Sequence, residues 1–325
     1  MTQHLKTLRV GLIGVGKMGL HHVAAIGKAP GAKLVGIVDP QADIEDLRGQ
    51  IPEDAALYSD VATLLKEARP DVVHVVTPPH THVAIARQLI RAGVHVYVEK
   101  PFAMTRADAD AVLSYATQHN VKICAGHQNL FEKPAILARE QIDSIGSTVH
   151  IESYFSFRQV RRTITPADQA KDILPHAVYP LVDQMRAGTG EQQAPIRVSG
   201  FDVRPSGDVY ALLRLRDCTG LLIVTLSGRP IEQYQTIVGS NGSMRADYVT
   251  GALTKVMGPG TGPGILLTPF RWALPALKAA SSNFMHVALG HHGSYPGLSV
   301  LVRTFYASIT AGGPLPMTPQ SILDT

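Results

Sequence analysis

The chain has 325 residues, of which 45% are hydrophobic and 17% are charged, and its formal net charge is +4. A chain of this length and apolar content can bury a core in each of two domains, which excludes an intrinsically disordered protein. Its densest basic cluster is Arg158, Arg161 and Arg162, which is too small for a nucleic-acid-binding arm, so we expect no nucleic-acid partner.

The N-terminal segment from Met1 to Arg9 is polar and leads directly into an apolar run, so it lacks the form of a signal peptide. No stretch reaches the roughly eighteen uninterrupted apolar residues that span a bilayer. The two cysteines, Cys124 and Cys218, have no metal-ligand spacing around them and are interpreted as free thiols. These features predict a soluble, cytoplasmic protein.

Apolar runs alternate with helical patterns in the first third of the chain. The runs are apolar at nearly every position, as in strands of a parallel sheet that is covered on both faces. They are Leu8–Ile13, Lys33–Val38, Val72–Val76, Val94–Val98 and Val121–Ala125. The helices predicted between them are His21–Lys28, Asp60–Ala68, His82–Ala92 and Arg106–His119, the last with Thr105 as its N-cap. This alternation is typical of a doubly wound α/β Rossmann domain, which we place at residues 1–126.

The pattern changes after about Gly146, where strand-like runs follow one another. They are Thr148–Phe157, Ile196–Val203, Val209–Leu215, Gly220–Leu226, Tyr234–Val238 and Ser243–Val249, with hairpin-like connections at 216–220 and 240–242. Helices are predicted at Ile173–Ala187, Phe270–Met285 and Gly297–Ala311, and a Gly/Pro-rich loop at 258–264. Residues 127–325 are therefore expected to form an α+β domain with a large open antiparallel sheet.

A glycine motif follows the first predicted strand and opens a helix. Gly14 suits the tight turn, Gly16 lets the backbone approach a pyrophosphate, and Gly19 lets helix and strand pack closely. Lys17 and Met18 occupy the start of the helix, where unpaired N–H groups and the helix dipole attract phosphates. The motif predicts a dinucleotide site.

Asp39 lies at the end of the second predicted strand, 25 residues after Gly14. A carboxylate there accepts hydrogen bonds from the adenosine ribose and repels a 2′-phosphate, which favours NAD over NADP. The alternative interpretation of Asp39 and Pro40 is a simple turn.

Three motifs together resemble the Gfo/Idh/MocA oxidoreductases, the family of glucose–fructose oxidoreductase and inositol dehydrogenase. They are Gly-Val-Gly-Lys-Met-Gly at 14–19, Thr-Pro-Pro-His-Thr-His at 77–82 and Val-Glu-Lys-Pro-Phe at 98–102. The resemblance covers essentially the whole chain and is strongest over residues 8–130. It implies that the dinucleotide is also lined by Thr77, Pro78, His80, Glu99, Lys100 and Gln128.

The resemblance also implies the catalytic residues. Lys100 follows a strand at the carboxyl edge of the sheet, where a cation would stabilise the substrate oxygen. Asp172 and His176 match the family's D-x-x-x-H at the start of a helix, and this spacing puts both on one face. His176 would take the hydroxyl proton, because a position in the first turn favours the neutral imidazole. Asp172 would orient it or bind substrate; alternatively, it is only the N-cap of the helix. Leu174 and Tyr179 depart from the family's pattern.

Three further residues are candidate substrate contacts: His127, after the fifth strand, and Tyr154 and Arg158, at the first strand of the second sheet. Alternatively, Tyr154 only covers a face of the sheet, where such residues are expected without any contact to substrate. His80 and His82 lack a third ligand nearby, so no metal is expected.

The segment 265–285 is unusually apolar for an exposed helix. We expect it to meet a protein partner, a fused domain or a second subunit rather than a membrane surface. The family usually continues beyond the point that matches Pro319 with a helix that returns to the first domain. The end at Thr325 indicates either a shortened helix or a module of a longer polypeptide. A homo-oligomer through the open sheet is also expected.

These observations predict an NAD-dependent oxidoreductase that transfers a hydride between nicotinamide and a carbinol or carbonyl carbon of a polyol, sugar or sugar derivative. Two alternatives stay open. One is a non-catalytic dinucleotide-binding module of a larger fused protein, and the other is a redox-assisted glycosidase.

Overall fold

The computed structural model describes residues 7–42, 44–47, 49–158, 165–258, 266–288 and 295–325. Contacts divide the chain into two compact units. Unit 1 comprises residues 1–128 and 294–323, and unit 2 comprises residues 129–293 and 324–325.

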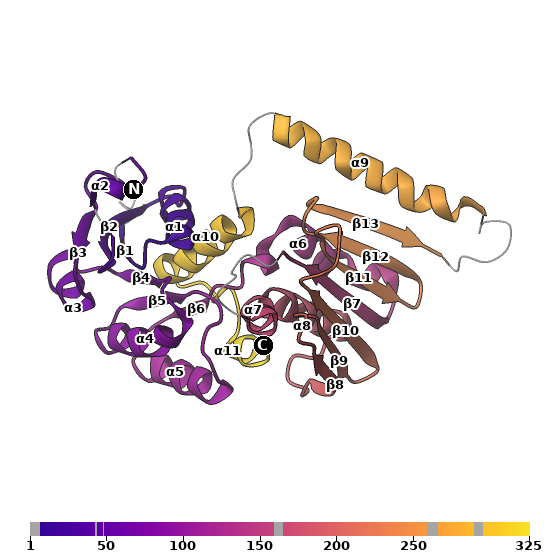
Figure 1. Ribbon diagram of the computed structural model, residues 1–325, viewed down its shortest axis with the longest axis horizontal. Helices are drawn as coiled ribbons and strands as arrows, with labels where there is room; N and C mark the ends of the chain where they lie inside the picture. The colour runs from indigo at the N-terminus through magenta and orange to yellow at the C-terminus, as the bar shows by residue number, and fades with distance from the viewer. Residues whose placement is uncertain (1–6, 43, 48, 159–164, 259–265, 289–294) are drawn as a thin grey trace. The chain divides into compact units, whose positions relative to one another are not determined.

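Unit 1 is built on a parallel sheet with the strand order β3-β2-β1-β4-β5-β6. Its strands are β1 (Leu8–Ile13), β2 (Ala32–Val38), β3 (Ala56–Tyr58), β4 (Val72–Val75), β5 (His95–Val98) and β6 (Ile123–Ala125). Figure 1 shows α1 and α10 on one side of this sheet and α4 and α5 on the other. The predicted doubly wound domain is confirmed. Only β3 has no counterpart in the prediction, because three residues are too few to form a recognisable apolar run.

The helices of unit 1 include α1 (Lys17–Gly27), α2 (Ile44–Leu47), α3 (Val61–Thr63), the π-helical turn η1 (Leu64–Ala68), the 3-10 turn η2 (Pro79–Thr81), α4 (His82–Arg91) and α5 (Arg106–Gln118). The four predicted helical segments of unit 1 are present, but Asp60–Ala68 forms a short helix followed by a π-helical turn, and α2 and η2 have no counterpart in the prediction. The predicted cap of α5 is present, since the Thr105 hydroxyl accepts a hydrogen bond from the Asp108 N–H at 3.1 Å. Helix α1 begins earlier than the predicted His21, because Gly16 serves as its N-cap.

The C-terminal helices α10 (Pro296–Ala311) and α11 (Pro319–Leu323) fold with unit 1. The prediction assigns residues 127–325, and with them the helix at Gly297–Ala311, to the second domain; it contains no helix at 319–323. The difference arises because the apolar stripe of α10, including Leu298, Leu301 and Phe305, is buried in unit 1, where α10 contacts α1. The Lys122 ammonium also donates to the Ser308 carbonyl oxygen of α10.

Unit 2 is built on a seven-stranded sheet with the order β13-β12-β11-β7-β10-β9-β8. Its strands are β7 (Thr148–Ser156), β8 (Arg197–Val203), β9 (Val209–Leu215), β10 (Cys218–Thr225), β11 (Gln233–Gly239), β12 (Gly242–Asp247) and β13 (Ala252–Met257). The predicted open sheet is confirmed with two corrections: β13 has no counterpart in the prediction, and β7 and β10 pair in parallel, so the sheet is mixed. A parallel pair requires a long crossover, which α7, α8, β8 and β9 supply here.

The helical elements that follow β6 and precede α10 are the 3-10 turn η3 (Gln128–Phe131), α6 (Lys133–Gln141), the 3-10 turn η4 (Ile142–Ile145), α7 (Pro166–Ile173), α8 (Pro175–Thr189) and α9 (Thr268–Ala288). Helix α6 contacts β12, β13 and α8. Helix α8 packs on β7 and β10, with Leu181 and Met185 in the core. The sequence predicts one helix at 173–187, whereas the structure has α7 and α8, because Pro175 lacks the N–H that a continuous helix needs.

Helix α9 contacts β13 in unit 2, and Figure 1 shows the two side by side. Its apolar residues Phe270, Leu274 and Leu277 are each more than half exposed, at 61%, 63% and 65%. The expected apolar surface near 265–285 is therefore present over the described part of that segment. Among the helices of the described residues, none combines the length and apolar character needed to cross a membrane.

Candidate active site

The glycine turn after β1 has the geometry of a dinucleotide cradle. Gly14 has φ +89°, and a Cβ there would lie 2.5 Å from the Val76 carbonyl oxygen. A Cβ at Gly16 would meet no atom within 4 Å, so the space beside its backbone is open. A Cβ at Gly19 would collide with the Gly14 carbonyl oxygen. The three glycines thus supply a turn, an open approach and close helix packing, as a pyrophosphate site requires.

The start of α1 is suited to an anion. Its N-cap, Gly16, has no side chain to cap the first turn, and that turn carries no acidic residue. Lys17 is exposed and Met18 is half-buried beside it. The unpaired N–H groups and the positive end of the helix dipole therefore face outward with a lysine next to them, which fits the phosphates of a dinucleotide.

Asp39 joins the end of β2 to the glycine turn. One carboxylate oxygen accepts from the Val15 N–H at 2.9 Å, and the other accepts from the Gln41 N–H at 3.0 Å. The second bond is the turn that the alternative interpretation expects, and the first one ties Asp39 to the cofactor motif. A carboxylate has about four lone-pair positions, so Asp39 retains acceptor capacity for ribose hydroxyls.

The loop after β4 is held by its own hydroxyls and by a buried histidine. The Thr81 hydroxyl donates to the Pro78 carbonyl oxygen at 2.7 Å and lies 2.6 Å from the Thr77 hydroxyl. His82 is fully buried, with Nε2 at 2.7 Å from the Thr77 carbonyl oxygen and Nδ1 at 2.9 Å from the Pro101 carbonyl oxygen. His82 therefore links this loop to the Lys100 turn, a role that the sequence does not reveal. His80 is exposed.

Glu99 and Lys100 follow β5, and the Lys100–Pro101 peptide bond is cis. Lys100 is half-buried, whereas Glu99 is only 4% exposed. One Glu99 oxygen lies 3.0 Å from His22 Nε2 and accepts from the Tyr97 hydroxyl at 3.5 Å. The other accepts from the Lys100 N–H at 3.1 Å. The Glu99 carboxylate thus points into unit 1, so we expect it to act on the cofactor site through Lys100 rather than by direct contact.

Electrostatics favour an ionised Glu99. Burial by itself raises the pKa of this carboxyl group, but the hydrogen bond from His22 and the electrostatic interactions with His22 and Lys100 together outweigh burial and lower the pKa below its usual value. The site therefore holds a buried carboxylate directly before the candidate catalytic lysine.

His127 and Gln128 follow β6 and are almost fully enclosed, with exposures of 3% and 1%. Burial lowers the pKa of His127 to about 4, against the opposing charge of Glu99, so its imidazole is neutral at pH 7. A Cβ at Gly126 would lie 2.8 Å from a Glu99 oxygen, so glycine is needed there. The Gln128 side-chain oxygen has no hydrogen-bond partner among the described residues.

In unit 2, His176 is the second residue of α8, directly after Pro175. Its ring stacks on Phe155 with a centroid distance of 5.8 Å and an interplanar angle of 6°. Its carbonyl oxygen accepts from the side-chain amides of Asn129 at 3.3 Å and Gln233 at 3.4 Å. The predicted helix-start position of His176 is confirmed, but no local signal identifies Phe155 or Gln233, because they reach His176 from separate strands.

Asp172 lies in the last turn of α7 rather than at a helix start. The N-cap interpretation is wrong, because Thr165 caps α7 by accepting from the Asp168 N–H at 3.1 Å. Leu174 connects the two helices with φ −49° and ψ −43°, so the backbone stays nearly helical from Asp172 to His176.

Tyr154 and His176 do not share a face of the sheet. The neighbours of Tyr154 on β7 face α8: the Ser153 hydroxyl donates to the Ala177 carbonyl oxygen, and Phe155 stacks on His176. Side chains alternate along a strand, so Tyr154 lies on the opposite face, where it stacks on Tyr234 at 5.2 Å.

That opposite face carries further polar and aromatic contacts. The Tyr234 hydroxyl donates to Glu152 at 3.1 Å, and the Arg245 guanidinium lies 3.5 Å from the centre of the Tyr234 ring. Arg158 is exposed just beyond β7, where its carbonyl oxygen accepts from the Gln169 amide at 3.2 Å. The structure therefore separates Tyr154 from His176, with which the sequence grouped it as a substrate contact.

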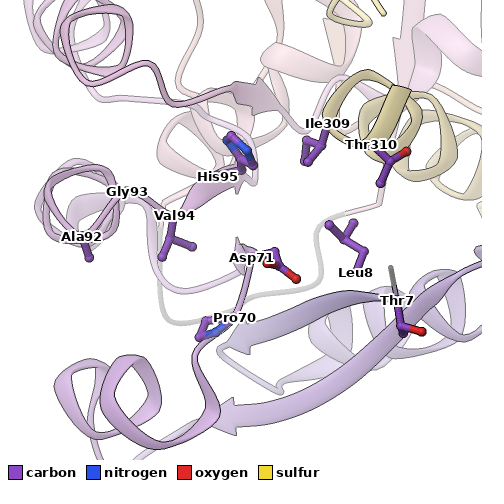
Figure 2. A pocket seen from close by; sticks show the side chains of 10 residues that line it. All are labelled: Thr7, Leu8, Pro70, Asp71, Ala92, Gly93, Val94, His95, Ile309 and Thr310. Carbon is purple, nitrogen blue, oxygen red and sulfur yellow. The ribbon is translucent and has the colours of Figure 1, made fainter. Parts of the chain in front are cut away.

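A cavity of about 420 Å³ lies at the other end of the unit 1 sheet (Figure 2). Leu8 and His95, at the starts of β1 and β5, line it with Asp71 and with Ile309 of α10. The glycine turn and Lys100 follow the carboxyl ends of the same strands. This cavity therefore belongs to the edge of the sheet that carries none of the predicted site residues.

A family model described as an oxidoreductase family with an NAD-binding Rossmann fold matches residues 8–127. This segment includes the glycine turn, Asp39 and Lys100. Inositol 2-dehydrogenase 1 of Saccharopolyspora erythraea is 29% identical over 165 residues, which are 49% of this chain and 49% of that protein. UDP-N-acetylglucosamine 3-dehydrogenase of Acidithiobacillus ferrooxidans is 34% identical over 121 residues, 37% of each. These matches span half the length of the relatives or less.

Solved structures resemble nearly the whole chain. The structure of UDP-N-acetylglucosamine 3-dehydrogenase from Acidithiobacillus ferrooxidans has a TM-score of 0.74 at 19% identity, and the match covers 98% of this chain and 93% of that one. The WlbA dehydrogenase of Bordetella pertussis, in complex with NADH and UDP-GlcNAcA, has a TM-score of 0.73 at 19% identity, with 98% and 92% covered. At such identities the likeness shows the fold alone.

Proposed function

We propose that this chain is an NAD-dependent dehydrogenase or reductase of a polyol, sugar or sugar derivative, because residues 8–127 match the family model of NAD-binding oxidoreductases and the similar proteins include an inositol dehydrogenase and a UDP-N-acetylglucosamine dehydrogenase. The observation that carries the proposal is the Lys100 turn, in which a buried carboxylate anchors a half-buried lysine at the carboxyl edge of the sheet. Open α/β sheets bind their ligands at this edge.

Lys100 provides the positive charge at the reaction centre. When NAD⁺ is bound, its nicotinamide supplies the acceptor for a hydride from the substrate carbinol carbon. The Lys100 ammonium stabilises negative charge on the substrate oxygen as that oxygen becomes a carbonyl. Thr77, Pro78, His80 and Gln128 are proposed to line the dinucleotide with the glycine turn.

His176 is the proposed base, which takes the proton of the substrate hydroxyl during oxidation and returns it during reduction. Its position in the first turn of α8 favours the neutral ring that a base needs. Asp172, His127 and Arg158 remain proposed substrate contacts. Tyr154 is the weakest member of this set, since its side chain lies on the other face of the sheet.

NAD rather than NADP is the proposed partner of the enzyme. Asp39 presents a carboxylate at the end of β2, bonded to the glycine turn through the Val15 N–H. Its negative charge repels a 2′-phosphate and accepts hydrogen bonds from free ribose hydroxyls.

The face of the sheet that carries Tyr154, Tyr234 and Arg245 is the proposed homo-oligomer surface. Aromatic and arginine side chains are enriched at such interfaces. The exposed stripe Phe270, Leu274 and Leu277 on α9 is a second proposed protein contact. The cytoplasmic location stays a prediction.

The proposal is tested with a panel of free polyols, aldoses, uronates and nucleotide sugars in the presence of NAD⁺ or NADP⁺. NADH binding is measured separately by fluorescence. We expect turnover of at least one substrate with NAD⁺. Lys100→Met should reduce kcat by about 10²–10³-fold and leave NADH affinity within a few-fold, while the surface control Lys66→Met should change neither.

Two outcomes identify the alternatives. NADH binding without turnover of any panel member would favour the non-catalytic module. Cleavage of a glycosidic bond without net NADH formation would instead favour the redox-assisted glycosidase.

A further inference from the structure

Four buried polar side chains form a continuous hydrogen-bonded chain through unit 1. The Tyr306 hydroxyl of α10 lies 2.8 Å from His74 Nε2 on β4. His74 Nδ1 lies 2.7 Å from His22 Nδ1 on α1, and His22 Nε2 lies 3.0 Å from a Glu99 oxygen. All four residues are at most 4% exposed. This series of hydrogen bonds therefore runs from α10 to Glu99, the residue before Lys100, through buried side chains alone.

Donor and acceptor roles along this chain follow from one premise. The Tyr306 hydroxyl is buried and His74 Nε2 is its hydrogen-bond partner, so its proton is satisfied only if it donates there. His74 Nε2 is then an acceptor, and a neutral His74 carries its proton on Nδ1. That proton goes to His22 Nδ1, which leaves the His22 proton on Nε2, facing the Glu99 carboxylate. Every donor in the chain thus points toward Glu99.

The surroundings support a neutral His74 ring and an ionised Glu99. Burial, followed by the neighbouring His22, lowers the pKa of His74 well below its usual value. The His74 ring also stacks on Tyr97 at 4.6 Å and 14°, and the edge of His22 meets Tyr97 at 5.0 Å. Aromatic contacts therefore fix the ring planes in which the hydrogen bonds lie.

Glu99 is the point at which the chain meets the proposed reaction centre. Its second oxygen accepts from the Lys100 N–H, so the carboxylate is bonded to the chain on one side and to the lysine turn on the other. Titratable or charged groups from three neighbouring elements face the Glu99 carboxylate. They are His22 of α1, Tyr97 and Lys100 at the end of β5, and Cys124 and His127 at β6. His74 and Tyr306 lie behind His22.

We propose that Tyr306, His74 and His22 are positioning residues that act through Glu99 to hold the Lys100 turn. A buried carboxylate that lost its donors would protonate or rotate, and the Lys100 backbone would lose its acceptor. Helix α10 thereby contributes to the reaction centre without touching substrate. The role in turnover rests on the proposed function, whereas the direction of the hydrogen bonds does not.

The direction is tested by ¹⁵N NMR of the full chain labelled at histidine, without cofactor or substrate. His22→Gln and His74→Gln spectra assign the two signals. Between pH 6 and 8 we expect the Nδ1–H tautomer at His74 and the Nε2–H tautomer at His22. An Nε2–H tautomer at His74, or an imidazolium at His22, would overturn the arrangement.

The positioning role is tested by kinetics against pH in three variants. Tyr306→Phe removes the first donor, His22→Leu removes the donor to Glu99, and His22→Gln restores a donor there. We expect kcat to fall about fivefold in Tyr306→Phe and more than tenfold in His22→Leu, with the acid limb of kcat/KM about one pH unit higher in the latter. The acid limb of kcat/KM moves to higher pH because a carboxylate that has lost a hydrogen-bond donor protonates at higher pH.

The matched control is Tyr115→Phe in unit 1. The Tyr115 ring lies under the Arg87 guanidinium and belongs to none of the four hydrogen-bonded residues. This variant should leave both kcat and the acid limb unchanged. His22→Gln should return the limb toward the wild-type position. A merely structural role would lower the melting temperature of the variants in parallel without moving the limb, and that result would contradict the proposal. Absence of turnover in the wild type would count against the proposed function only, because the tautomer measurement still decides the hydrogen-bonded chain.

Discussion

The Lys100 turn of unit 1 and the His176 junction of unit 2 are stabilised in different ways. Beneath Lys100 lies a buried carboxylate that is bonded to side chains of α1 and β5 and to its own turn. His176 stands at a junction between two helices, with its carbonyl oxygen bonded to two side-chain amides. In the first arrangement the bonded group is a buried side chain, whereas in the second it is a backbone carbonyl oxygen.

The comparisons also differ between the two regions. The family model matches residues 8–127, which include the Lys100 turn and stop before the His176 junction. The structural likeness covers 98% of the chain at only 19% identity. A cradle for one dinucleotide demands fixed residues, while a helix junction over a sheet can be built from many sequences. Unit 2, the proposed substrate side, is therefore the region in which sequence motifs carry least information.

The largest expected effect concerns the unit 2 half. We expect His176→Asn to reduce kcat by roughly 10²–10³-fold, because the proposed proton acceptor is removed, while NADH affinity stays within a few-fold. His150→Asn, on the same unit but on β7, is the matched control and should retain activity. If His176→Asn kept more than a tenth of wild-type kcat, the two halves would not share the chemistry, and the base would have to be sought elsewhere.

Next in size is a contrast within the glycine turn. Gly14→Ala combines a positive φ with a Cβ only 2.5 Å from the Val76 carbonyl oxygen, so it should lower the free energy of unfolding by roughly 2–4 kcal/mol. Gly16→Ala places its Cβ in open space, so it should leave stability within about 0.5 kcal/mol but weaken NADH binding about tenfold or more. Urea denaturation and fluorescence titration measure the two effects. Equal losses of stability in both variants would contradict the assignment of Gly14 to the turn and of Gly16 to the open approach for the pyrophosphate.

Cofactor choice should change more modestly. Asp39→Asn keeps a carbonyl oxygen that can accept from the Val15 N–H but removes the charge that repels a 2′-phosphate. We expect the ratio of the NADPH and NADH dissociation constants to fall by about tenfold. Unchanged selectivity between NADH and NADPH would mean that Asp39 only stabilises the turn, in which it accepts from the Gln41 N–H.

The last prediction concerns a pH dependence of the free energy of unfolding that arises in unit 1. The pKa of His127 is lowered from 6.5 to about 4 in the folded protein. Between these values the unfolded chain binds a proton that the folded chain does not, so the free energy of unfolding falls as pH drops from 6.5, by roughly 3 kcal/mol at most. Denaturation of His127→Gln at pH 7, 6 and 5 should show a shallower fall than that of the wild type. The exposed control His119→Gln should follow the wild type, and a wild-type slope in His127→Gln would contradict the assignment.

Much of unit 1 follows from the sequence alone. Short continuous apolar runs that alternate with helical patterns are typical of strands covered on both faces, Thr105 caps α5 as its side chain predicts, and the glycine spacing leads to the observed turn at Gly14. These features are local, since each depends on neighbours within a few residues along the chain. The same reasoning places His176 at a helix start, because Pro175 is tolerated only in the first turn.

Only the tertiary structure decides the rest, because the partners lie far apart in the sequence. The inward Glu99 carboxylate depends on His22, 77 residues away, and the link from His74 to Tyr306 spans 232 residues. Helices α9 and α10 are both rich in apolar residues, yet Phe305 is buried in unit 1 and Phe270 is 61% exposed. Burial depends on whether a complementary surface exists, which no local pattern contains. The sequence by itself therefore determined the cofactor cradle and the chemistry of its residues, and folding decided which buried groups support Lys100.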